Sequence, residues 1–128
     1  MKQFSIQVRD RVGELARVTE IMANHGINII AISSEGAGSK RPVIRIVTED
    51  QASTRKALER AGREFTEEEI LVVKLLDRPG ELAKIARRLA RKAINVNSIY
   101  IFGKSDGKTE IALAVDKLDE AREVLGVR

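Results

Sequence analysis

Asp10-Arg11-Val12-Gly13-Glu14-Leu15-Ala16 decides the fold, because it returns 67 residues later as Asp77-Arg78-Pro79-Gly80-Glu81-Leu82-Ala83. The same offset, with no gap, carries residues 27–29 (Ile-Asn-Ile) onto residues 94–96 (Ile-Asn-Val). A whole module is therefore repeated, and we expect one copy at residues 1–69 and the other at residues 70–128. Two copies suit a paired binding unit better than a solenoid, which needs three or more repeats to bury its core.

The composition is that of a soluble globular protein, with 43% hydrophobic and 33% charged residues among 128. No apolar run approaches a membrane span, and the first six residues alternate where a signal peptide would be continuously apolar, which predicts a cytoplasmic protein with no membrane partner. The chain has no Cys, so disulfides and thiolate chemistry are excluded. The net charge of +4 lies in the second copy, much of it on Lys84, Arg87, Arg88 and Arg91 along one helix face. A solvated face explains this spacing better than a patch for nucleic acid or an acidic partner.

Hydrophobic periodicity assigns the first two elements of each copy. Phe4, Ile6 and Val8 alternate with polar residues and predict a strand ending at Asp10, with a counterpart ending near Asp77. Apolar residues then recur at helical spacing and predict the buried stripe of an amphipathic helix: Leu15, Val18 and Met22 in the first copy, and Leu82, Ile85 and Leu89 in the second.

The turn and strand after each predicted helix carry two irregularities. Gly26 suits a helix-terminating position with positive φ, whereas its counterpart Ala93 does not, so we expect the second turn to close differently. In the second strand Ile27 and Ile29 alternate, but Ile30 and Ile32 continue with the opposite parity. The second copy changes parity at the same place, which predicts a β-bulge or a local twist of the strand.

The remaining elements complete an α+β fold. Glycine-containing loops at residues 36–39 and 103–107 precede a third strand, and a second helix follows at residues 51–61 or 118–125. The order predicts two tandem ferredoxin-like βαββαβ modules, each an antiparallel sheet with both helices on one face. Residues 64–68 supply a fourth strand to the first copy, but the second has too few residues left. Its open edge predicts a homo-oligomer, most simply a dimer.

The repeated motif has a definite chemistry at the start of a helix. Backbone N–H groups there attract a carboxylate, and Gly13 and Gly80 let a ligand approach the backbone closely. Asp10 and Asp77 add a negative group nearby, so a free amino acid would be matched at both its carboxylate and its ammonium group. On its spacing alone, the motif is explained better as a simple capped turn.

Asn28 and Asn95 follow the opposite ends of the same helices. Their amides donate and accept, so they complete recognition of the same ligand if modules pair side by side. Each is also consistent with a structural role in satisfying loop backbone.

Together with the Gly-Ile-Asn-Ile turn at residues 26–29, the repeated motif resembles the ACT domain family, small ligand-binding modules that regulate enzymes of amino-acid metabolism. The resemblance covers essentially the whole chain and implies a non-catalytic amino-acid sensor without a cofactor, acting on an amino-acid biosynthetic enzyme. Its site would lie where two modules pair through their second strands. Val12 in place of Pro and Ala93 in place of Gly depart from the family pattern. The ligand contacts it implies are Asp10, Val12, Gly13 and Asn28, with Asp77, Pro79, Gly80 and Asn95.

Catalysis, RNA binding and a protein-interaction adaptor are the alternative functions. Catalysis is disfavoured, because His25 is the only histidine, its counterpart is Lys92, and no nucleophile or metal-ligand constellation surrounds it. RNA binding by a sheet of this topology stacks bases on aromatic side chains, of which the chain has four, so a nucleic-acid partner is disfavoured. A protein-interaction adaptor that binds no small molecule is the third alternative. Residues 67–69, all Glu, protect a strand edge more plausibly than they bind a metal.

Overall fold

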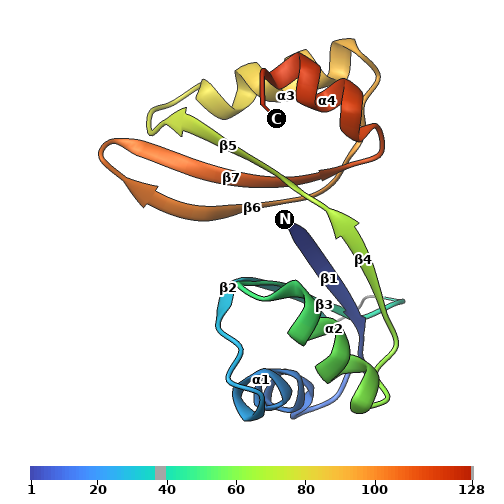
Figure 1. Cartoon of the computed structure of the whole chain (residues 1–128). Coiled ribbons are helices and arrows are strands. Elements are labelled where there is room, and N and C mark those ends of the chain that lie inside the picture. The colour runs from blue at the N-terminus through green and yellow to red at the C-terminus, as the bar shows by residue number, and fades with distance from the viewer. Residues whose placement is uncertain (37–39, 128) are drawn as a thin grey trace. The chain divides into compact units, whose positions relative to one another are not determined.

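The computed structural model describes residues 1–36 and 40–127, which form two compact units, Met1–Glu68 and Glu69–Arg128. Each unit is an antiparallel sheet that carries a pair of helices (Figure 1). The α+β class and the tandem ferredoxin-like modules predicted from the repeat are therefore confirmed.

The first unit contains the full set of six elements. They are β1 (Lys2–Gln7), α1 (Glu14–Asn24), β2 (Ile29–Glu35), β3 (Val43–Thr48), α2 (Gln51–Arg60) and β4 (Phe65–Glu69). The strand order is β2-β3-β1-β4, with β3 antiparallel to both β1 and β2. The first strand ends at Gln7 and not at Asp10, because the backbone turns after Val8 and the N–H of Arg11 donates to the carbonyl of Arg9 at 2.9 Å.

The second unit repeats this order without a fourth strand in its described residues. It contains β5 (Leu71–Leu76), α3 (Glu81–Arg91), β6 (Val96–Ser105), β7 (Lys108–Val115) and α4 (Leu118–Leu125). The strand order is β5-β7-β6, and Figure 1 shows α3 and α4 on one face of that sheet. Both β5 and β6 are thus edge strands of the described sheet.

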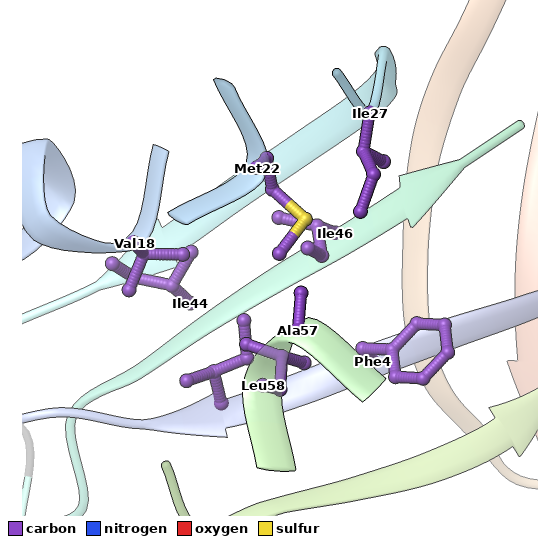
Figure 2. Packing of buried hydrophobic residues seen from close by; sticks show 9 residues of the cluster. Phe4, Val18, Met22, Ile27, Ile44, Ile46, Ala57 and Leu58 are labelled. Carbon is purple, nitrogen blue, oxygen red and sulfur yellow. The ribbon is translucent and has the colours of Figure 1, made fainter. Parts of the chain in front are cut away.

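Each unit has its own hydrophobic core between helices and sheet. In the first, Val18 and Met22 of α1 pack with Leu58 of α2 over Phe4 and Ile46 of the sheet (Figure 2). The second core is built in the same way around Ile85 and Leu89 of α3.

The predicted helix stripes were wrong at their first positions. Leu15 is 51% exposed and Leu82 is 44% exposed, whereas the later stripe residues are buried. Leu15 stands in the first turn of α1, where it lines a groove described below instead of the core. A stripe predicted from spacing extends over every turn, but the leucine in the first turn of each helix stays about half exposed.

Both first helices end in the same left-handed turn, so the prediction of a different closure at Ala93 was wrong. The φ angle is 64° at Gly26 and 55° at Ala93. The N–H of Ile27 donates to Met22 at 2.9 Å, and that of Ile94 donates to Leu89 at 3.0 Å. Ile94 is 5% exposed, so its burial and the paired hydrogen bonds outweigh the roughly 1–2 kcal/mol that an alanine costs in this conformation.

We therefore expect Ala93→Gly to stabilise the protein by about 0.5–1 kcal/mol, since relief of the left-handed strain exceeds the gain in unfolded-chain entropy. Urea unfolding would measure this change. Gly26→Ala should lower the stability. No atom lies within 4 Å of the added Cβ, so the only cost is the strain of an alanine at positive φ. Ala86→Gly, on the exposed side of α3, should destabilise by about 1 kcal/mol. A loss of stability in Ala93→Gly would contradict this explanation.

The predicted bulge in the second strand of each copy is confirmed. The register shifts between Ile29 and Ala31 in β2 and between Val96 and Ser98 in β6. The hairpin loops were predicted less well. Residues 37–39 lie outside the described residues, while in the second copy β6 runs to Ser105 and leaves a two-residue turn of Asp106 and Gly107, with φ of 51° and 72°. Positive φ at both positions is the type I′ geometry that matches strand twist.

Candidate functional site

The glycines of the repeated motif start the first helix of each unit. Gly13 is the N-cap of α1 with φ 92° and ψ −3°, and Gly80 is the N-cap of α3 with φ 88° and ψ −13°. This left-handed conformation explains why glycine is required in both copies. Having no side chain, glycine leaves the first-turn N–H groups without the cap that Ser or Asp would supply. We call the segments 10–14 and 77–81 turn one and turn two.

An arginine and a glutamate lock each turn. Arg11 donates through Nε to Glu14 at 2.6 Å, and Arg78 donates through Nε to Glu81 at 2.7 Å. These hydrogen bonds are the main cause that lowers the pKa of both glutamates below the ordinary value. These four residues were not predicted as site residues, although the arginine and the glutamate recur in the duplicated motif.

The two glutamates differ in their second hydrogen-bond partner. Glu14 is 4% exposed and also accepts from Arg63 at 3.1 Å, which ties turn one to the end of α2. Glu81 accepts instead from Lys84 of its own helix at 3.1 Å. Glu14 is therefore also held by a residue distant in sequence, whereas Arg78 and Lys84, which hold Glu81, lie within three residues of it.

Because the pKa of Glu14 is lowered in the folded state, its charge stabilises the fold above the pKa of the unfolded chain, and this contribution is lost as pH falls through the folded value. Glu14→Gln should therefore be less stable than the parent near about pH 7, and the two should converge near about pH 2. Urea midpoints at several pH values would measure this. Glu20→Gln, exposed on α1, should stay within about 0.5 kcal/mol of the parent throughout. A difference that persists in acid would contradict the assignment.

Turn one opens onto a groove of about 200 Å³. The groove brings together two of the predicted contacts of its unit, Asp10 and Gly13. It does not include Val12, which is 97% exposed, or Asn28. Its charged lining carries both signs, and its walls come from turn one, the end of β2 and the start of β3: Val8, Arg9, Asp10, Arg11, Gly13, Glu14, Leu15, Ser34, Glu35, Gly36, Pro42 and Ile44.

The space over the two glycines differs. The Nη1 atom of Arg17 lies 2.9 Å from where a Cβ on Gly13 would stand, and it donates to the carbonyl of Val12 at 3.3 Å. Lys84, the counterpart of Arg17, turns to Glu81 instead, and no atom lies within 4 Å of a Cβ built on Gly80. Turn one is thus covered by a guanidinium group, whereas turn two is open.

The aspartates also differ. Asp77 lies 3.6 Å from the Nζ atom of Lys104, with both side chains about half exposed (49% and 55%). The backbone N–H of Asp77 donates to Gly107 at 2.8 Å, which fixes turn two against the tip of the β6–β7 hairpin. The residue 67 positions before Lys104 is Ala37, which carries no charge. A cationic partner of this kind is therefore specific to the second copy.

The two asparagines lie away from the glycines of their own units. Asn28 donates through Nδ2 to Glu49 at 3.2 Å, and the backbone N–H of Asn95 donates to Asp116 at 2.9 Å. An 11-residue helix separates each asparagine from its glycine, a length of about 16 Å. One unit therefore does not bring these predicted contacts together.

The other residues raised by the sequence have structural partners. His25 caps the C-terminus of α1, where its Nδ1 faces the carbonyl of Ile21 at 2.9 Å and must carry the proton. Glu67 accepts from Arg55 at 2.7 and 2.5 Å, which lowers its pKa. Within residues 1–36 and 40–127, no three His, Cys, Asp or Glu residues are placed to hold a metal ion.

The basic face of α3 borders a second groove, of about 560 Å³, between α3 and α4. Arg88 donates there to the carbonyl of Val124. Acidic residues of α4 share the lining with the cations, so the groove is not uniformly positive: Arg88, Arg91, Lys92, Glu120, Glu123 and Val124.

The fold and the repeated helix start define a pair of small ferredoxin-like modules. The sequence profile of the ACT domain matches residues 2–65 and 70–125, so the chain belongs to the ACT domain family, whose modules are regulatory and non-catalytic. Among curated protein sequences none matches the chain.

Solved structures share the fold over nearly the whole chain. A protein from Bacteroides thetaiotaomicron is 24% identical and superposes with a TM-score of 0.86, covering 98% of this chain and 85% of its own. The regulatory subunit of aspartate kinase from Thermus thermophilus is 20% identical, with a TM-score of 0.71 and coverage of 98% and 87%. The corresponding subunit from Thermus flavus is 22% identical, with a TM-score of 0.70 and coverage of 98% and 88%. In the described parts of this chain, no helix is long and apolar enough to cross a membrane.

Proposed function

We propose that this protein is a sensor of a free amino acid, which it binds at the glycine turns. The observation that carries the proposal is the groove at turn one, because it joins the start of a helix, the left-handed Gly13 and the carboxylate of Asp10 in one concave site. Its volume of about 200 Å³ suits a small metabolite better than the drug-sized ligands that fill about 300–1,000 Å³.

The chemistry of both turns matches the two charged ends of an amino acid. The first-turn N–H groups of α1 and α3 and the positive helix end favour a carboxylate. Asp10 and Asp77 favour an ammonium group, and at turn two Lys104 stands close enough to compete for Asp77. Val12 and Pro79 shape the backbone before the glycine, so we propose them as contacts made through the main chain.

Asn28 and Asn95 stay in the proposal as contacts to a ligand held by a module of a second copy of the chain. Two edge strands, β2 and β6, carry exposed isoleucines at equivalent positions, Ile32 at 43% and Ile99 at 45% exposure. Burial of such residues favours assembly. We therefore propose a homodimer that acts in the cytoplasm on an amino-acid biosynthetic enzyme.

The alternative of RNA recognition is less well supported. Phe4 is fully buried and packs on Phe65 with ring centroids 6.0 Å apart, so two of the four aromatic residues belong to the core. Base stacking needs accessible rings on the sheet.

A melting-temperature screen against the standard amino acids tests the proposal, because a ligand that binds only the folded state stabilises it by RT ln(1 + [L]/Kd). We expect at least one amino acid to raise Tm by several degrees at a concentration about 100 times Kd, where the gain is about 2.7 kcal/mol. Absence of any shift, together with salt-sensitive binding of RNA, would replace the proposal by its alternative.

Matched variants then show which turn binds the amino acid found in the screen. Asp10→Asn and Asp77→Asn keep side-chain size and remove the charge, so the variant at the working turn should weaken binding about tenfold. Asp119→Asn, 96% exposed on α4, is the control and should bind like the parent. Gly80→Ala adds a Cβ in open space and should weaken a hit at turn two. If the amino acid binds both aspartate variants as tightly as the parent, the proposal that it binds at the glycine turns is wrong.

A further inference from the structure

Thr109, at the start of β7, has a buried hydroxyl that the fold does not use. The side chain is 7% exposed, and its Oγ1 atom has no hydrogen-bond partner within the described chain. Leaving a buried hydroxyl unpaired is costly, so a threonine here calls for a physical explanation.

The register of the sheet places this hydroxyl beside turn two. Thr109 pairs with Leu75 of β5 on one side and with Lys104 of β6 on the other. Leu75 packs against the core beneath α3, so Thr109 faces the side of the sheet that carries the helices. Lys104 reaches Asp77 at 3.6 Å, which puts Thr109 and the carboxylate of turn two around the same side chain.

The first unit confirms which way this position faces. The counterpart of Thr109 is Pro42, and that of Leu75 is Val8. Both Pro42 and Val8 line the groove at turn one, together with Asp10 and Gly13. The same position in the second unit therefore faces the equivalent place next to Gly80, where it carries a hydroxyl in place of a proline ring.

We propose that Thr109 determines specificity at turn two by hydrogen-bonding an oxygen atom in the side chain of the bound amino acid. This inference rests on the proposed function. The α-carboxylate is matched by the first-turn N–H groups of α3 and the ammonium by Asp77, so the side chain of the ligand is the part left for Thr109. The ligand class is an amino acid whose side chain ends in a hydroxyl, amide or carboxylate.

Lys104 competes with the ligand for Asp77. It is the cross-strand neighbour of Thr109, and its exposed ion pair with Asp77 at 3.6 Å is of the weak kind. An incoming ammonium group displaces Lys104 from Asp77, which frees a cation next to Thr109 for an anionic side chain. Turn one has proline at the equivalent position and does not discriminate in this way.

The first test needs no ligand. Thr109→Val keeps the shape and removes the unpaired hydroxyl, so the ligand-free Tm should rise. The control is Thr54→Val, because Thr54 is also buried but its hydroxyl is bonded to Thr48 at 2.6 Å and to the carbonyl of Asp50 at 2.8 Å. Its Tm should fall. A fall of similar size in Thr109→Val would mean that the hydroxyl has a structural partner, and would overturn the inference.

The second test compares isosteric ligands by calorimetry, using threonine against valine and asparagine against leucine. The parent should prefer the oxygen-bearing member of a pair, and Thr109→Val should weaken its binding about tenfold while leaving the apolar member unchanged. Thr109→Ser, which keeps a hydroxyl, should retain the preference. If amino acids bind the parent and Thr109→Val binds each of them as tightly as the parent does, the inference fails and the proposed function stands. If no amino acid binds the parent, the proposed function itself fails.

Discussion

The left-handed glycine at the start of each first helix is the constraint on which the rest depends. A residue with φ near 90° turns the chain from β1 into α1, or from β5 into α3, within a few residues. It also leaves the helix start without a side-chain cap, so no side chain competes with an anion for the N–H groups there. The neighbouring arginine and glutamate hydrogen-bond to each other and hold this turn in place. The duplicated motif therefore sets both the backbone conformation of the turn and the charged groups around it.

Around that shared backbone the two copies have diverged. Turn one has Arg17 over its glycine, Arg63 on its glutamate and a proline at position 42. Turn two has an open glycine, a lysine beside its aspartate and a threonine at position 109. Because φ and ψ at the two glycines agree within about 10°, these side chains are what distinguishes the two sites.

The order of elements, the sheet topology and the bulge in the second strand followed from the sequence, because a repeat shows the same hydrophobic pattern twice. Local conformation was harder to predict. Ala93 adopts a conformation that its propensity disfavours, since tertiary contacts of Ile94 decide the turn. Leu15 fits a stripe by spacing, but it lines the groove at turn one and stays about half exposed. The roles of Arg11, Glu14 and Thr109 depend on distances and burial that spacing does not report. Asp10 and Gly13 were predicted together and do share a groove, whereas Asn28 lies a helix length away.

Each half of the chain encloses a separate set of core residues. The two core clusters share no residue, so a substitution inside one does not remove a side chain from the other. Pro42 and Thr109 occupy matched positions of the repeat, where one scaffold presents a proline ring in one half and a hydroxyl group in the other.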